Sequence, residues 1–269
     1  MKWIVLIVVL VVQSWRPVLW QASLWRQYAH WLEVWARRLN MNTSDPGRWG
    51  LGVVVPLLML WLIQKGSTYL GLEYIVEGMV LWFCLDFHQA VNGLTMRHEQ
   101  GVGSSAGESQ GLREAIEVAL NHAYRWFFAP LWWFFVLPGA SGALLYLCAW
   151  KVAQWLSSED KEEGMAWRFV GLLDWIPLRL TALSFAVVGD FEEALFVWRG
   201  LVPRHSSHLL IAVAGGALGI TLGSHTDSDE DEEVLMDEAD LLSTEGLLWR
   251  TLVLWVVVFG LLTTATWLR

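Results

Sequence analysis

The chain has 269 residues and a positive mean hydropathy of +0.41; 55% of its residues are hydrophobic and only 17% are charged. A soluble domain usually carries about 25% charged residues, so this composition argues against a free-standing soluble enzyme. The 20 tryptophans point the same way, because tryptophan is enriched at the two surfaces of a membrane. We therefore expect an all-α, polytopic integral membrane bundle whose first partner is the lipid bilayer.

The net charge of −9 comes mainly from one segment. Residues 227–240 hold nine acids, and no lysine or arginine lies between Arg204 and Arg250. Because the rest of the chain is close to neutral, it has no basic surface of the kind that binds nucleic acid, and we expect no such partner. The segment 224–246 is predicted to be an acidic, disordered loop.

Residues 1–48 are predicted to hold N-terminal and interfacial helices. Between residues 18 and 39, apolar residues recur at helical spacing while charged residues gather on the opposite side, which is typical of an amphipathic helix in the membrane interface. Its apolar face consists of Trp20, Leu24, Tyr28, Trp31 and Trp35. Arginines close to the membrane favour a cytoplasmic location for residues 1–48.

Four later stretches are predicted to span the membrane, which takes about 20 mainly apolar residues. A helical hairpin is expected over 49–87, with spans at 49–63 and 69–87 and a turn at 64–67. After a polar loop or helix at 88–125, residues 126–150 are expected to form one spanning helix. The C-terminal span lies in 247–269, where Leu252 to Leu268 carries no charge.

Residues 168–223 are predicted to hold a half-helix and a glycine-rich helix. Asp174 fits a helix N-cap and Pro177 fits the first turn, so a helix could run from Trp175 to Val188. Fourteen residues give about 21 Å, too short to cross, which suggests a re-entrant segment or one tucked into the bundle. Asp174 and Arg179 could neutralise one another as a structural ion pair, or Arg179 could bind an anion beside the helix N-terminus.

Glycines recur every four residues in the last part of this segment. That spacing places small residues on one helix face and lets two helices approach closely in lipid. Close packing within the protein is the simpler interpretation, and a homodimer interface is the alternative. The glycines are Gly215, Gly219 and Gly223.

Metal and catalytic chemistry find little support in the sequence. Glu73, Glu77, Cys84 and His88 share one helix face. The first and last of these lie about 22 Å apart along a helix, however, so they cannot converge on one ion. No phosphate-binding glycine loop or nucleophile motif is present. We therefore expect no metal, no cofactor and no catalytic residues.

Three stretches nevertheless resemble the CbiB/CobD superfamily. They cover less than half of the chain, from about residue 110 to 223. The stretches are Ala129-Pro130-Leu131-Trp132-Trp133 with Gly142-Ala143-Leu144-Leu145-Tyr146, then Leu173-Asp174-Trp175-Ile176-Pro177-Leu178-Arg179-Leu180-Thr181-Ala182-Leu183, and finally Ala214-Gly215-Gly216-Ala217-Leu218-Gly219-Ile220-Thr221-Leu222-Gly223.

The superfamily has two branches, an amide-forming enzyme of cobalamin synthesis and the membrane protein AmpE, which is linked to β-lactamase induction and cell-wall recycling. The enzyme branch carries acidic elements near its start, before the Ala-Pro-Leu stretch and after the tyrosine. At the last two places this chain has 121–125, without an acid, and Val152 with Ala153. Amide formation needs acids that hold magnesium on phosphates, so their loss argues against that activity.

Residues 124–130 and 184–191 resemble the AmpE-like branch instead. The resemblance implies a non-catalytic inner-membrane regulator or sensor, with Asp174, Arg179 and Asp190 as candidate ligand-binding residues. A small anionic ligand or another membrane protein would be its partner. The alternative is a divergent adenosylcobinamide-phosphate synthase.

Overall fold

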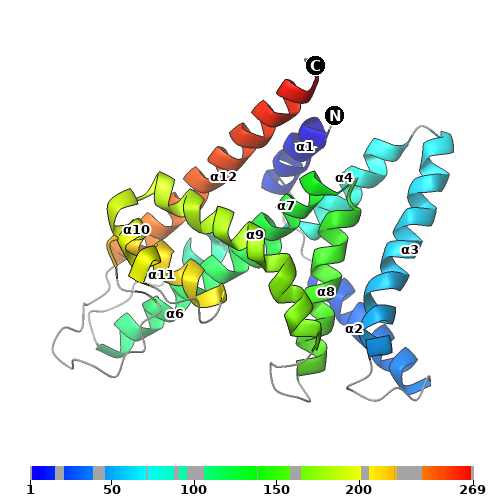
Figure 1. Ribbon diagram of the computed structural model, residues 1–269, viewed down its shortest axis with the longest axis horizontal. Helices are drawn as coiled ribbons and strands as arrows, with labels where there is room; N and C mark the ends of the chain where they lie inside the picture. The colour runs from blue at the N-terminus through cyan, green and yellow to red at the C-terminus, as the bar shows by residue number, and fades with distance from the viewer. Residues whose placement is uncertain are drawn as a thin grey trace. The chain divides into compact units, whose positions relative to one another are not determined.

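The computed structural model describes the chain in blocks, and its regular structure is helical throughout those blocks (Figure 1). The predicted all-α class is therefore confirmed for the described part of the chain. The blocks are residues 2–15, 21–38, 46–70, 72–87, 91–95, 106–137, 139–157, 165–200, 206–220, 222 and 238–267.

The chain divides into two compact units. Unit 1 comprises Met1–Asp86 and Ala129–Asp174, and unit 2 comprises Phe87–Phe128 and Trp175–Arg269. One helix, α9 (Met165–Val188), begins in unit 1 and ends in unit 2.

Unit 1 is built around packed pairs of helices: α1 packs against α4, α3 against α8, and α7 against α8. At the first contact, the buried Gln13 of α1 donates a hydrogen bond of 2.6 Å from Nε2 to the carbonyl of Leu85, just after the end of α4. This bond satisfies one of the carbonyls that a helix C-terminus leaves without an intrahelical donor. The helices are α1 (Lys2–Trp15), α2 (Gln21–Arg38), α3 (Pro46–Leu70), α4 (Glu73–Cys84), α7 (Ala129–Val136) and α8 (Ser141–Ser157).

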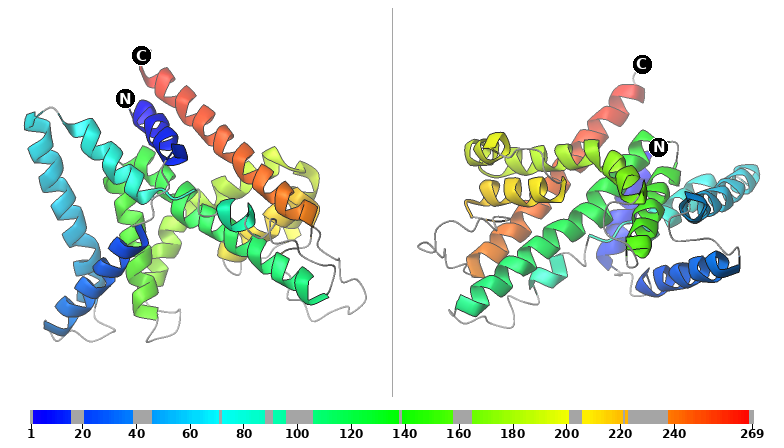
Figure 2. Two further views of the ribbon diagram at one scale, coloured as in Figure 1. Left: turned by 180° about the vertical axis from the view of Figure 1, so that it is seen from behind. Right: turned by 60° about the horizontal axis from the view of Figure 1, so that its bottom comes forward.

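Unit 2 packs its helices around aromatic side chains. Phe128 lies with its ring centroid 5.3 Å from that of Trp255 and 6.1 Å from that of Phe185. α10 and α11 lie side by side (Figure 1), and α12 runs against α6 (Figure 2). The elements are α6 (Ala106–Ala123), the π-helix η1 (Tyr124–Phe128), the second part of α9, α10 (Phe191–Gly200), α11 (Ser206–Leu218) and α12 (Glu238–Trp267).

Three helices of the described residues are long and apolar enough to cross a membrane, so this is a multi-pass membrane protein. They are Gly50–Thr68, Met165–Val188 and Ala239–Ala265. The predicted span at 49–63 overlaps the first of these helices, and the predicted span at 252–268 overlaps the last. The predicted turn at 64–67 is wrong, because α3 continues to Leu70. The expected span at 69–87 is reduced to α4, whose 12 residues give only about 18 Å.

The single spanning helix predicted at 126–150 is also wrong. α7 ends at Val136 and α8 begins at Ser141, and between them Gly139 adopts a left-handed φ of 68°. α8 then returns tightly along α7, since a Cβ at Gly142 would collide with the backbone oxygen of Trp133. A glycine-centred turn therefore interrupts the helix that the apolar run predicted.

Pro130 shapes the start of this region. Pro130 has no N–H and cannot donate to the carbonyl of Trp126, four residues earlier. The helix widens there into the π-turn η1, directly before α7. Widened turns are one of the ordinary ways in which a helix accommodates such an interruption.

Pro56 opens a similar gap in α3, and a side chain from α2 fills it. The carbonyl of Gly52 loses its usual donor because Pro56 has no N–H. The hydroxyl of Tyr28 donates to that carbonyl. Burial, together with the neighbouring Cys148 thiol, raises the pKa of the Tyr28 hydroxyl, so it remains a protonated donor.

The acidic segment divides at Glu238. Its predicted disorder between 224 and 237 lies outside the described residues. From Glu238 onward the prediction is wrong, because these residues form the start of α12, and Leu241 and Leu247 are buried there. Acids in a first helical turn complement the helix dipole, which explains why Glu238 and Asp240 are compatible with a helix start.

Candidate functional site

Two of the stretches that resemble the superfamily meet around Asp174, within unit 1. Tyr146 of α8 donates a hydrogen bond of 2.8 Å from its hydroxyl to Oδ1 of Asp174. Tyr146 is fully buried and Asp174 is 1% exposed. The two residues are 28 positions apart in the chain, and no sequence motif indicated that they form a pair.

A second polar contact completes this cluster. Trp133 of α7 donates from Nε1 to the carbonyl of Leu173, over 3.3 Å. That carbonyl is available because Pro177, four residues later in α9, has no N–H. The arrangement repeats the Tyr28–Gly52 bond of α3: in both helices an aromatic donor from a neighbouring helix satisfies a carbonyl that a proline has left open. In lipid, where no water can serve, such replacement matters most.

These contacts correct the predicted half-helix. α9 begins at Met165, so Asp174 lies in its tenth position and is not an N-cap, and Pro177 lies inside the helix. The interruption is tolerated because Trp133 compensates for the lost backbone bond. With 24 residues, α9 is long enough to cross a membrane.

Asp174 is placed to hold helices together. Its side chain is closed off from solvent, and the Tyr146 hydroxyl ties its Oδ1 to α8. Removing one partner of such a buried polar pair reduces stability, because the donor or acceptor that remains keeps its full desolvation cost.

Arg179 faces a different environment. Its Nη1 donates 2.9 Å to the carbonyl of Trp175, and its guanidinium lies 4.6 Å from the centroid of the Trp175 ring. Among the described residues, Arg179 does not form the expected ion pair with Asp174. Positions five apart on an α-helix point about 140° away from one another, which explains the separation. Ligand binding by Asp174 or Arg179 stays a prediction.

Asp190 begins a helix. Its Oδ1 accepts hydrogen bonds from the backbone N–H groups of Glu192 at 3.0 Å and Glu193 at 3.2 Å, which is the geometry of an N-cap for α10. Its own N–H donates 2.9 Å to the carbonyl of Ala217 in α11. Its predicted role in ligand binding also stays a prediction.

The glycines of α11 do not form the predicted stripe. Gly219 lies just beyond the helix with a φ of 71°. Its N–H donates to the carbonyl of Gly216, and the N–H of Ile220 donates to the carbonyl of Gly215. This is a Schellman motif, which ends a helix at a left-handed residue. Gly215 packs against the returning chain, since a Cβ there would lie 2.7 Å from the Ile220 oxygen. Gly223 lies outside the described residues.

Another glycine supports the close helix contact instead. A Cβ at Gly216 would lie 3.0 Å from the Cα of Ala194 in α10, and one at Gly189 would collide with the carbonyl of Ala217. Sequence reasoning missed both positions because it followed the four-residue spacing. The adjacent Gly215-Gly216 pair was the signal that could have indicated Gly216.

The remaining polar candidates form no metal cluster within the described blocks, where no three His, Cys, Asp or Glu side chains come together to hold an ion. Cys84 and Cys148 are unpaired by disulfide and buried. Burial raises the pKa of both thiols, that of Cys148 to about 12, and a protonated thiol is a poor nucleophile and metal ligand. His88 lies outside the described residues.

Comparison with known proteins gives the following matches. A family model described as "Regulatory signalling modulator protein AmpE" matches residues 85–263. "Cobalamin biosynthesis protein CobD" of Chromobacterium violaceum is 36% identical over 180 residues, which cover 64% of this chain and 56% of that protein. The protein of the same name from Stutzerimonas stutzeri is 28% identical over 200 residues, covering 65% of each.

"Protein AmpE" of Shigella flexneri is 26% identical over 208 residues, covering 69% of each chain. No solved structure matches. The chain thus spans a little over half to about two thirds of the length of these relatives. The matched residues 85–263 include Tyr146, Asp174 and Arg179 and make up well over half of the chain. The resemblance drawn from the motifs is confirmed, and the chain belongs to the AmpE family.

Proposed function

We propose that this protein is a regulatory component of a bacterial inner membrane, linked to β-lactamase induction and cell-wall recycling, and that it acts without catalysing a reaction. The observation that carries the proposal is the match of the family model for a regulatory signalling modulator to residues 85–263. The three candidate membrane spans are consistent with a protein that acts within the bilayer.

The geometry around Asp174 supports a non-catalytic role. Its carboxylate is buried and bonded to Tyr146, where it holds α8 against α9. Val152 and Ala153, near which the enzyme branch carries an acidic element, are fully buried apolar residues of α8. Magnesium on phosphates needs oxygen ligands open to the substrate, and these positions offer none.

Induction of β-lactamase tests this role. The gene is deleted in its natural host, and β-lactamase activity is measured with and without a β-lactam inducer. We expect the deletion to change the ratio of induced to uninduced activity, and the wild-type chain supplied from a plasmid to restore it. An unchanged ratio in the deletion strain, with the protein present in the parent membrane, would contradict the proposed function.

The second candidate is a divergent adenosylcobinamide-phosphate synthase, which the likeness to two proteins named for cobalamin biosynthesis favours. Complementation separates the two functions. In a strain that lacks the synthase, we expect this chain to reach the membrane and to leave corrinoid-dependent growth unrestored. Restored growth would establish the enzyme and exclude the regulator as its sole role.

We further propose that α2 lies in the membrane interface on the cytoplasmic side. Its hydrogen bond from Tyr28 to Gly52 ties it to the first part of α3, close to the start of a candidate span. Its exposed Arg26 and Arg38 would face lipid headgroups. A cysteine at the exposed Gln27 should react with a membrane-impermeant maleimide in inside-out vesicles and not in intact spheroplasts; the reverse result would invert the orientation.

A further inference from the structure

Between Trp175 and Val187, the candidate span α9 presents an apolar face with one cation in it. Trp175, Ile176, Leu183 and Val187 are 57%, 41%, 44% and 56% exposed. At about 100° per residue, these four positions fall within an arc of about 120°, and Arg179 falls inside the same arc. Between Trp175 and Val187 this surface consists of large apolar side chains around a single guanidinium; Arg168 lies on the same side of the helix, near its start.

The guanidinium lies near the middle of the helix. Arg179 is nine residues, or about 14 Å, from the end of α9 at Val188. Its bond to the Trp175 carbonyl turns the side chain toward the helix N-terminus and away from that nearer end. The charge is therefore held at depth and does not reach toward the closer membrane surface.

This charge lacks a full counterpart in the described part of the chain. Its contacts there are a backbone carbonyl and the Trp175 ring, and no described carboxylate forms an ion pair with it. Charged side chains within a bilayer are costly and normally pair with another polar group or face a water-filled cavity. A carbonyl and a ring offset part of that cost, but neither carries the negative charge that would neutralise the guanidinium.

The missing anion does not come readily from lipid headgroups or from the candidate spans of a second copy. Phosphate headgroups lie at the edges of a hydrocarbon layer about 30 Å thick, far from the middle of a spanning helix. In the other two candidate spans, Gly50–Thr68 carries no acid and the acids of Ala239–Ala265 stop at Glu245, near one end. Asp174, on α9 itself, is buried against Tyr146.

We propose that this face of α9 docks a transmembrane helix of another protein, and that an Asp or Glu near the middle of that helix pairs with Arg179. The apolar side chains around Arg179 would exclude water from the pair and pack against the partner. Such a partner deepens and rests on the proposed regulatory role, because a regulator in the membrane needs a way to contact the protein it controls.

Model helices test this pairing directly. The full-length protein, labelled with a donor fluorophore, is reconstituted in phosphatidylcholine liposomes with acceptor-labelled Leu-rich transmembrane peptides. One peptide carries Glu at its centre, and the matched peptide carries Leu. Interhelical polar contacts in membranes are worth enough to predict about fivefold to thirtyfold tighter association of the Glu peptide, measured by energy transfer.

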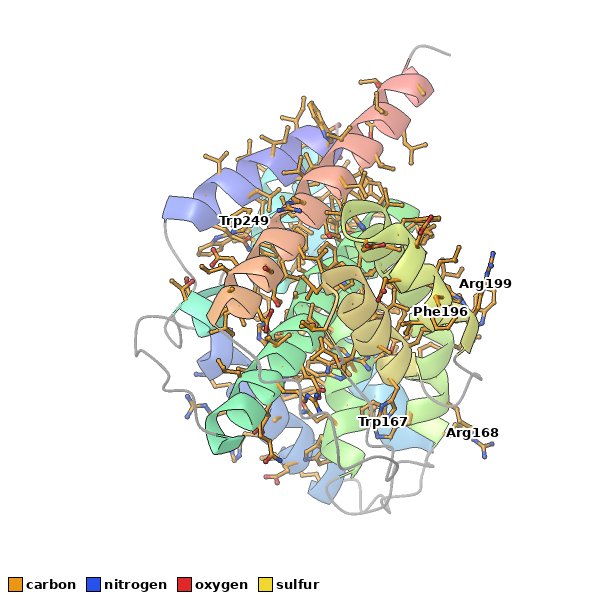
Figure 3. All side chains as sticks on the ribbon, turned by 90° about the vertical axis from the view of Figure 1, so that its left-hand side faces the viewer. Trp167, Arg168, Phe196, Arg199 and Trp249 are labelled. Atoms are coloured by element: carbon orange, nitrogen blue, oxygen red, sulfur yellow. The ribbon has the colours of Figure 1, made fainter. Side chains whose placement is uncertain are left out.

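Two arginine variants make the result specific. Arg179→Met should bind both peptides equally. Arg168→Met is the matched control, because Arg168 is exposed near the start of the same helix and extends outward from the ribbon (Figure 3), and it should keep the preference. Equal binding of the two peptides by the wild-type protein would overturn the proposal.

A lipid headgroup in place of the partner helix would give a different result. If labelled phosphatidylglycerol gathers around the wild-type protein and not around Arg179→Met, while the peptides bind equally, the anion is a lipid headgroup and the partner-helix proposal is wrong. None of these measurements uses β-lactamase. The pairing can therefore fail while the regulatory function stands, and the deletion experiment can fail while the pairing stands.

Discussion

Asp174 and Arg179 lie five residues apart on one helix, and their surroundings are opposite. The carboxylate is buried and bonded to the hydroxyl of Tyr146, whereas the guanidinium lies on an exposed apolar face beside Trp175. Asp174 has its main polar partner inside its own unit, whereas the contacts of Arg179 with the described residues are a backbone carbonyl and a ring. The comparison teaches that a charge in a membrane helix can be a structural link or an open contact point, and that the helical phase decides which.

Asp174→Ala should reduce the stability of the protein more than any other substitution considered. The change leaves the buried Tyr146 hydroxyl without its acceptor and opens a small cavity. We expect a loss of about 3 kcal/mol in the free energy of unfolding, measured by denaturant titration in detergent. Asp174→Asn is the control, because its amide oxygen still accepts the bond, and it should lose far less. Equal losses would mean that charge, and not the hydrogen bond, matters at this position.

The next largest effect concerns the carbonyls that the two prolines leave open. Trp133→Phe removes the donor to Leu173, and Tyr28→Phe removes the donor to Gly52. Each should cost about 1–2 kcal/mol of unfolding free energy, because a buried carbonyl is left unsatisfied. Trp175→Phe, on the exposed face of α9, should be close to neutral in the same titration. A neutral Trp133→Phe would show that the freed carbonyl finds another donor.

Substitution of Arg179 should barely change the free energy of unfolding in detergent. Arg179→Met removes a partly exposed cation and keeps a long apolar stem, so we expect a change below about 0.5 kcal/mol in unfolding free energy. The same variant should lose the preference for a Glu-bearing helix in liposomes. A stability loss as large as that of Asp174→Ala would show that Arg179 also serves the fold.

The sequence was sufficient for the helical class, for the helices containing the first and last predicted spans, and for singling out Asp174 and Arg179. It could not show that Tyr146 and Trp133 reach α9, because those contacts join positions 28 and 40 residues apart. Without them Pro177 read as a helix start, whereas in the structure it is a tolerated interruption. The break near Gly139 was missed for a related reason: an apolar run with prolines fits a kinked helix and a tight helical turn equally well.

The glycine pattern failed for a different reason. Spacing alone predicts a face only while the helix continues, and Gly219 ends α11. The close approach to α10 falls one position away from the predicted stripe, at Gly216. Helix termination and helix packing both use glycine, so the sequence pattern could not separate them.

A pair of double-mutant cycles tests the central contrast most directly. One cycle combines Tyr146→Phe with Asp174→Ala, and the other combines Arg179→Met with Asp174→Ala, all measured by unfolding in detergent. The first should give a coupling energy of about 1 kcal/mol, as expected for residues in direct contact. The second should be additive within about 0.5 kcal/mol. Strong coupling between Asp174 and Arg179, with none between Asp174 and Tyr146, would contradict the account.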